Sequence, residues 1–226
     1  MYADDTCILV PSPAGIQKLL DMCSVYALHY NYVLFNEAKT KCMCFKPKGY
    51  NLCIPTVKLN NTPLIFTDTC NYLGIMLHYD LQDDDDLLRH VKFIYAKGNI
   101  LVSRFIFCSD DVKLKLFRSY LCSLYGGQLW YNYNVSSFKK VVVAYNNVFR
   151  KFFGIQRGVS MSQIYMLCGV NSIGAIHRKN VYNFSERIVI SDNSIVQHLR
   201  HSCYNTYVSS VAAKNIANTL YMNVNT

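Results

Sequence analysis

The first eighty residues combine short apolar runs with one stretch of helical periodicity. Apolar positions between residues 16 and 28 recur at helical spacing, so residues 14–30 are predicted to form an amphipathic helix. Residues 6–10 are rich in β-branched and apolar side chains and end at Pro11 and Pro13, which predicts a strand followed by a break. The predicted strands are residues 6–10, 32–35, 41–46, 52–59, 63–66 and 71–78. This region is therefore expected to be mixed α and β.

Helical periodicity dominates after residue 83. Four consecutive aspartates, residues 83–86, precede the first such pattern, where negative charge complements the free N–H groups and the dipole of a helix start. They could also suggest a metal site, but consecutive carboxylates on one turn point in different directions, which favours the helix start. The first predicted helix follows these aspartates and continues to Phe105. Two more run from Ser109 to Leu124 and from Ser136 or Ser137 to Gly154. Further helices are predicted at residues 161–168, 174–190 and 192–213, before a polar tail from Asn215.

The chain has 226 residues, and its net charge of +9 is unevenly distributed. Residues 87–157 hold twelve Lys and Arg against two Asp, whereas residues 1–86 hold six against ten acids. A concentration of positive charge favours a polyanionic partner, because each neutralised phosphate releases condensed counterions. A merely solvated basic face explains the same charge, and charge alone does not decide between the two.

Apolar residues make up 51% of the chain and charged residues 16%, which argues against wholesale disorder. No apolar run reaches the roughly 18 to 20 residues of a membrane span, and the first residues carry acids where a signal peptide carries basic residues. We therefore expect an intracellular protein, in the nucleus or cytoplasm, with no membrane partner. Its ten cysteines are scattered through apolar stretches and are expected to be free thiols.

The sharpest chemical feature is Tyr2-Ala3-Asp4-Asp5, followed at once by the predicted strand. Two adjacent carboxylates in a tight turn can present oxygens to Mg²⁺, which proteins hold through few ligands and which substrate phosphates complete. In a two-metal site one ion activates a hydroxyl and the other stabilises the leaving pyrophosphate. The same four residues could also be an ordinary polar turn.

The order of features downstream favours the first interpretation. Tyr2-Ala3-Asp4-Asp5 resembles motif C of reverse transcriptases, and Phe35-Asn36-Glu37-Ala38-Lys39-Thr40-Lys41 resembles motif D of the non-LTR (LINE-type) retrotransposon enzymes. Asn71-Tyr72-Leu73-Gly74-Ile75 resembles the Tyr-Leu-Gly strand of motif E, the primer grip. Farther on, residues 145–154 and 185–193 resemble the thumb and post-thumb stretches of the same family.

The resemblance implies a role for each motif. Asp4 and Asp5 would be catalytic metal ligands, and Lys39 would lie near the incoming triphosphate, where it could stabilise or protonate the leaving pyrophosphate. Asn36 and Thr40 are expected to hold the turn before Lys41 whatever the function. Tyr72-Leu73-Gly74 would be the primer grip, with the missing side chain of Gly74 allowing the primer backbone to approach; the same residues could form a plain hairpin.

The implied fold is α+β: a partial right-hand polymerase palm over residues 1–80, a basic helical thumb over 81–157, and a post-thumb helical region with a polar tail over 158–226. The intact enzyme would copy an RNA template into DNA from a DNA primer by two-metal nucleotidyl transfer. Residues 1–226 do not include motif A, which carries a further metal-binding aspartate, or the fingers. We therefore expect weak or absent Mg²⁺ binding and no polymerase activity from this segment alone.

A second hypothesis comes from the basic residues rather than the motifs. A non-catalytic nucleic-acid-binding segment would use a basic helical face to contact backbone phosphates without reading base sequence. Lysines and arginines eleven positions apart share a face of one predicted helix, because eleven residues are about three turns. The candidate phosphate-binding residues are Lys92, Arg104, Lys139, Lys140, Arg150 and Lys151.

Overall fold

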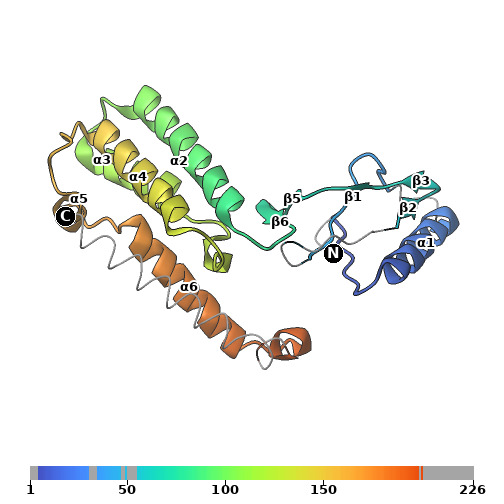
Figure 1. Ribbon diagram of the computed structural model, residues 1–226. Helices are drawn as coiled ribbons and strands as arrows, with labels where there is room; N and C mark the ends of the chain where they lie inside the picture. Colours follow the sequence, from blue (N-terminus) through green and yellow to red (C-terminus); the bar gives the residue numbers. More distant parts are fainter. Residues whose placement is uncertain (1–4, 31–34, 47–48, 50–54, 199, 201–226) are drawn as a thin grey trace. The chain divides into compact units, whose positions relative to one another are not determined.

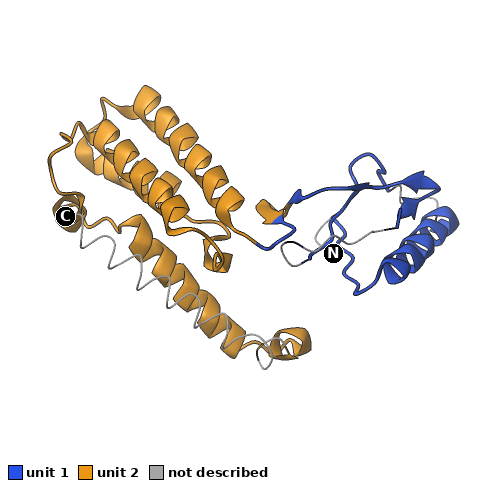
Figure 2. Cartoon of the chain, in the orientation of Figure 1, with its two compact units in different colours: residues 1–70, 78–81 blue, residues 71–77, 82–226 orange. Residues whose placement is uncertain are grey.

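The computed structural model describes residues 5–30, 35–46, 49, 55–198 and 200, and these fall into two compact units (Figure 2). One unit comprises residues 1–70 and 78–81, and the other comprises residues 71–77 and 82–226. We call them the N-terminal unit and the helical unit. The boundary between the units crosses a β-hairpin of residues 69–78. Residues 71–77 of this hairpin belong to the helical unit, and its remaining residues belong to the N-terminal unit.

The N-terminal unit contains helix α1 (Pro13–Tyr30), at the position that the periodicity predicts. Pro13 is its first residue rather than part of a break before it, since a proline at the first helical position loses no intrahelical hydrogen bond. Ser12 caps the helix, with its Oγ accepting a hydrogen bond from the backbone N–H of Gly15 at 3.2 Å. The Gln17 side chain then exchanges two hydrogen bonds with the main chain of Lys58, at 2.8 and 3.0 Å. This fixes α1 against a short strand.

The strands of this unit are shorter than the sequence suggests. β1 (Lys41–Cys42) pairs in parallel with β4 (Ile65–Phe66), and β2 (Lys58–Leu59) pairs antiparallel with β3 (Thr62–Pro63). Cys42 of β1 and Leu59 of β2, together with Val57 and Leu64 beside the strands, join Leu20 of α1 in a small core. The expected strand at residues 6–10 is wrong: this segment is not in a strand, and only Asp5 beside it makes a β-bridge. A β-rich run forms a strand only where a partner completes its ladder. The expected strand at 32–35 falls almost wholly outside the described residues.

The single β segment expected at residues 71–78 is a hairpin. β5 (Thr69–Tyr72) and β6 (Ile75–His78) form a two-stranded sheet joined by Leu73 and Gly74. Both turn residues have positive φ, 48° and 75°, as a type I′ turn requires. Glycine adopts this conformation freely, whereas Leu73 does so against its side-chain sterics.

The helical unit is built on helices α2 to α6, with a 3₁₀ turn η1 before α4 (Figure 1). Their bounds are α2 (Asp84–Phe105), α3 (Asp110–Leu121), η1 (Gly127–Leu129), α4 (Val135–Phe153), α5 (Met161–Leu167) and α6 (Ile173–Val189). Helices α2, α3 and α4 lie side by side, and α2 and α4 make the most extensive contact. Asn134, rather than Ser136 or Ser137, is the residue before α4. Residues 194–198 are helical, and most of the helix expected at 192–213 lies outside the described residues.

The α2–α4 contact depends on Gly98. A Cβ atom at this position would lie 2.5 and 2.6 Å from the two Cγ atoms of Val148 on α4, so only glycine lets the helices approach this closely. Phe117, Tyr145 and Phe149 fill the core around this contact and are completely buried. Residues of α5 and α6, such as Tyr165 and Ile173, belong to the same core. The stretches expected as thumb and post-thumb regions therefore share one hydrophobic core.

The cysteines that the structure describes are all free thiols. Among the described helices, none combines the length and the apolar composition needed to cross a membrane.

Candidate functional site

The aspartate pair at the start of the chain is only partly described. Asp4 lies outside the described residues, as does Tyr2, while Asp5 is exposed and makes a β-bridge. Among the residues that the structure describes, no group of three or more His, Cys, Asp or Glu side chains is placed to hold a metal ion. Because one of the two expected ligands is not described, magnesium binding at this turn stays a prediction.

Lys39 lies in the turn that the sequence indicates at residues 36–40. Asn36 holds this turn: its Oδ1 accepts a hydrogen bond from the backbone N–H of Lys39 at 3.0 Å. Its carbonyl oxygen also accepts from the Thr40 hydroxyl at 2.8 Å and from the Thr40 backbone N–H at 2.9 Å. The Lys39 side chain is exposed. Asp5 and Lys39 belong to the N-terminal unit, whereas Tyr72, Leu73 and Gly74 belong to the helical unit.

The Tyr72-Leu73-Gly74 turn is attached to the helical unit by Tyr125. The Tyr125 hydroxyl donates a hydrogen bond to the Leu73 carbonyl at 2.9 Å, and its ring covers Gly74, where an added Cβ would lie 3.2 Å from Tyr125 Cε1. A positive φ and this ring contact explain the glycine without a nucleic acid. The expectation that Gly74 leaves space for a primer backbone therefore needs revision, because the Tyr125 ring lies in that space.

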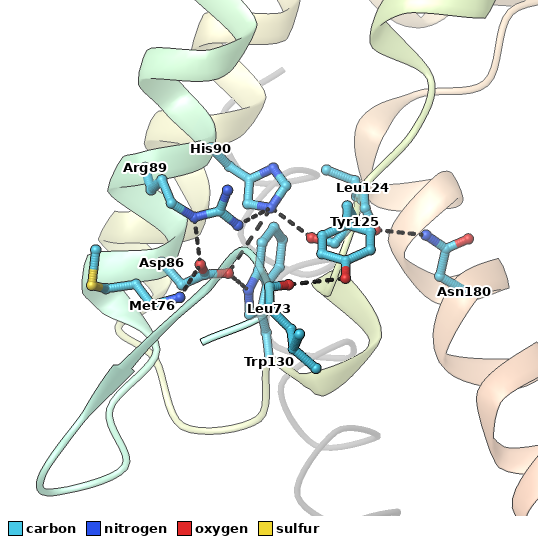
Figure 3. A network of polar contacts seen from close by, with 9 residues as sticks. All are labelled: Leu73, Met76, Asp86, Arg89, His90, Leu124, Tyr125, Trp130 and Asn180. Atoms are coloured by element: carbon cyan, nitrogen blue, oxygen red, sulfur yellow. Dashed lines mark hydrogen bonds and ion pairs between the residues drawn. The ribbon is translucent and has the colours of Figure 1, made fainter. Parts of the chain in front are cut away.

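A second attachment lies at the buried carboxylate of Asp86, on the first turn of α2 (Figure 3). Asp86 Oδ1 accepts hydrogen bonds from the Met76 backbone N–H at 2.9 Å and from Arg89 Nε at 2.7 Å. Its other oxygen accepts from the indole N–H of Trp130 at 2.7 Å. Asp86 therefore connects the hairpin, α2 and the segment before α4 through one side chain that is 1% exposed.

His90 extends this network by one turn of α2. Its Nε2 lies 2.8 Å from the Tyr125 carbonyl oxygen, so Nε2 carries the hydrogen in the neutral ring. Burial and the neighbouring Arg89 guanidinium lower the pKa of His90 below its usual 6.5, and Asp86 and the hydrogen bond to the Tyr125 carbonyl oppose them only in part. His90 is therefore neutral at pH 7 and serves as a hydrogen-bond donor rather than as a cation.

The other aspartates of the run also bind the segment before α4. Asp83 Oδ2 accepts from the backbone N–H groups of Tyr131 and Asn132 at 2.8 and 2.7 Å. The Asp84 carboxylate accepts from the backbone and side-chain nitrogens of Asn134 at 3.0 and 2.7 Å. The run does begin a helix, as the sequence indicates, and three of its carboxylates additionally fix a segment almost fifty residues away.

The candidate phosphate-binding residues fall into two groups. Lys139, Lys140 and Lys151 are exposed on α4 and, at about 100° per residue, span roughly a third of its circumference. Lys92 and Arg104 are exposed on α2, but twelve residues separate them, which places them about 120° apart around that helix. The basic residues of α2 therefore do not form a single row.

Arg150 is a correction to the expected set. Its guanidinium donates to the carbonyl oxygens of Gln156 and Val159, the latter at 2.6 Å, and so closes the loop after α4. A guanidinium engaged by two main-chain carbonyls is positioned by the fold rather than presented to a phosphate. The eleven-residue spacing from Lys139 places Arg150 on the expected side of α4 but does not reveal these partners.

The role of the residues that hold the hairpin is not predicted from the sequence; they are Asp86, Arg89, His90, Tyr125 and Trp130. Two signals were available, namely the spacing of Asp86 and Arg89 at i and i+3 and the presence of a single tryptophan in the chain. Neither signal shows that Trp130 lies against Asp86, 44 positions earlier. Comparison with protein-family models, with curated proteins and with solved structures finds no match to this chain.

Proposed function

We propose that this chain is a segment of a non-LTR retrotransposon reverse transcriptase, in which the helical unit holds the primer–template duplex behind the site of nucleotide addition. The observation that carries the proposal is the attachment of the Tyr-Leu-Gly hairpin to the helices. Leu73 bonds to Tyr125, and Met76 bonds to Asp86, each at 2.9 Å. A turn that positions a primer end needs such support, because a poorly held group loses the alignment that the reaction requires.

The exposed lysines of α4 supply the second element of the proposal. Lys140 and Lys151 are eleven residues apart, or about 17 Å along the helix axis, so they would contact different phosphates. Together with Lys139 they would provide contacts that are independent of base sequence, as a polymerase requires of the duplex it has just copied. Catalysis would use the Asp4 and Asp5 carboxylates with Mg²⁺, and Lys39 at the leaving pyrophosphate.

A salt titration tests the duplex contacts. The triple variant Lys139→Gln, Lys140→Gln, Lys151→Gln should bind an RNA–DNA duplex more weakly, with a plot of log affinity against log salt that is less steep by about 2.7. A matched control replaces three exposed lysines of the N-terminal unit, Lys18, Lys41 and Lys58, and causes the same loss of charge. Equal slopes for the two variants would contradict a specific role for α4. Arg150→Gln should leave the slope unchanged and lower stability instead.

The second candidate function is a non-catalytic nucleic-acid-binding segment, which the exposed lysines on α4 support by themselves. Photocrosslinking distinguishes it from the polymerase proposal. A primer carrying 5-iododeoxyuridine at its 3′ end should crosslink to the tryptic peptide that contains Tyr72 to Gly74, and a primer labelled one helical turn upstream should crosslink to α4. If crosslinks from both positions fall on α4 alone, the primer-grip assignment is wrong and only the binding function remains.

A further inference from the structure

A groove of about 860 Å³ lies within the helical unit, between the segment that follows α3 and one side of α6. This volume is within the range of about 300 to 1,000 Å³ that is typical of ligand sites. Its lining combines polar side chains with apolar surface. Tyr125, Asn180, Asn183, Glu186 and Arg187 are among the residues that line it.

The α6 wall of the groove presents a row of polar side chains. Asn180, Asn183 and Arg187 are three and four residues apart, so they lie along one side of the helix. Asn180 Nδ2 donates to the Leu124 carbonyl at 3.4 Å, which joins this wall to the opposite one (Figure 3). Asn183 and Arg187 are exposed. An amide both donates and accepts hydrogen bonds, and a guanidinium pairs with phosphate through two parallel N–H groups.

The opposite wall presents an aromatic ring. Tyr125 is 62% exposed although its hydroxyl is fixed to the Leu73 carbonyl. Its ring is therefore held in place at one end while much of its surface stays open to solvent. Nucleic-acid bases stack on such a ring whatever their identity, because every base has a π face. The Glu186 carboxylate, also in the lining, can accept a hydrogen bond from an exocyclic amino group of a base.

We infer that this groove binds a short unpaired stretch of nucleic acid, with one base stacked on Tyr125, its phosphate on Arg187 and its edge facing Asn183. The inference rests on the proposed function, because Tyr125 also holds the hairpin assigned to the primer. It adds a second contact surface to the lysines of α4, with a different substrate: single-stranded rather than paired nucleotides. An acidic peptide would satisfy Arg187 but has no base to stack on Tyr125.

The test measures binding of a fluorescein-labelled oligodeoxycytidylate of roughly ten nucleotides by fluorescence anisotropy, because cytosine carries an exocyclic amino group. Arg187→Gln should weaken binding about tenfold and make the salt slope shallower by about 0.7, which is one phosphate contact on a single strand. Arg178→Gln is the matched control. Arg178 is exposed on the same helix, and nine residues place it on the opposite side of α6 from Arg187.

A second pair of variants isolates the stacking contact. Tyr125→Phe and Tyr125→Leu both remove the hydroxyl bonded to Leu73, but only the phenylalanine variant keeps the aromatic ring. We expect Tyr125→Leu to bind the oligonucleotide at least fivefold more weakly than Tyr125→Phe. Equal affinities of the two would overturn the stacking assignment whatever the effect on folding, since both lose the same hydrogen bond.

The remaining outcomes separate this inference from the proposed function. If Arg187→Gln and Arg178→Gln bind the single strand equally, the groove is not a nucleic-acid site. This outcome would leave the proposal that the α4 lysines bind the duplex standing, because that proposal is tested separately. If single-strand binding depends on Arg187 but duplex binding does not depend on the α4 lysines, the groove stands and the duplex assignment fails. Binding of an acidic decapeptide with the same affinity and the same Arg187 dependence would overturn the assignment to nucleic acid.

Discussion

Replacement of Asp86 by alanine is expected to destabilise the helical unit more than any surface change. The carboxylate is 1% exposed and accepts hydrogen bonds from Met76, Arg89 and Trp130 at 2.9, 2.7 and 2.7 Å. Asp86→Ala leaves the buried indole N–H without an acceptor and the Arg89 guanidinium without its anion. Each buried donor left without an acceptor costs about 1–3 kcal/mol, and the partly exposed Arg89 adds less, so we expect the free energy of unfolding to fall by about 3–5 kcal/mol.

The isosteric variant gives a graded result. Asp86→Asn keeps the shape of the side chain and one acceptor oxygen. Its amide nitrogen, which cannot accept a hydrogen bond, replaces the other oxygen, so at least one of the three donors loses its partner. An unmade buried hydrogen bond costs about 1–3 kcal/mol, so this variant should lie between alanine and the unmodified protein. It also guards against an alanine variant that does not fold at all. Asp85→Ala is the control, because Asp85 is the neighbouring residue of the same helix turn and is exposed.

The assay is denaturant unfolding followed by tryptophan fluorescence. The chain has one tryptophan, Trp130, whose indole nitrogen is the donor to Asp86, so the signal reports the site of the change. The transition midpoint and its slope give the free energy of unfolding for each variant. If Asp86→Ala and Asp85→Ala differ by less than about 0.5 kcal/mol, the network does not hold the unit together in the way described.

Three further predictions concern other contacts of the helical unit. Gly98→Ala should cost about 1–3 kcal/mol of stability, because the new methyl group would overlap Val148. Val148→Ala in the same chain should recover most of this loss, and a double-mutant cycle measured by denaturant unfolding would show it. Lowering the pH through 6.5 should destabilise the unit, because the lowered pKa of His90 means that the unfolded chain takes up a proton before the folded one does. The stability of His90→Gln should then vary less with pH over this range, which thermal unfolding between pH 7 and 5 would show. Tyr125→Phe should speed amide hydrogen exchange in the hairpin around Leu73 several-fold, since one hydrogen bond is worth about 0.5–1.5 kcal/mol, and unchanged exchange would argue against the anchor.

Much of the local structure follows from the sequence. The 3.6-residue periodicity locates α2, α3 and α6 to within a few residues, because each helix buries one apolar side and its hydrogen bonds are made within the segment. The turn at Asn36 follows in the same way from a side chain that bonds to its own backbone. These interactions join residues a few positions apart, so the order of residue types is sufficient to predict them.

Tertiary structure decided the features that depend on residues far apart in the sequence, namely the strands and the partners of charged side chains. A β-rich run becomes a strand only if another segment completes its ladder, and residues 6–10 have no such partner among the described residues. The roles of Asp86 and Arg150 were also hidden. Each lies on a helix whose pattern is plain from the sequence, but the carboxylate meets an indole 44 positions away, and the guanidinium meets carbonyls of a loop without any marked sequence pattern. A charged side chain on a predicted helix can face solvent, a ligand or the rest of the protein, and only packing distinguishes these, because the free energy of each depends on the groups that surround the charge.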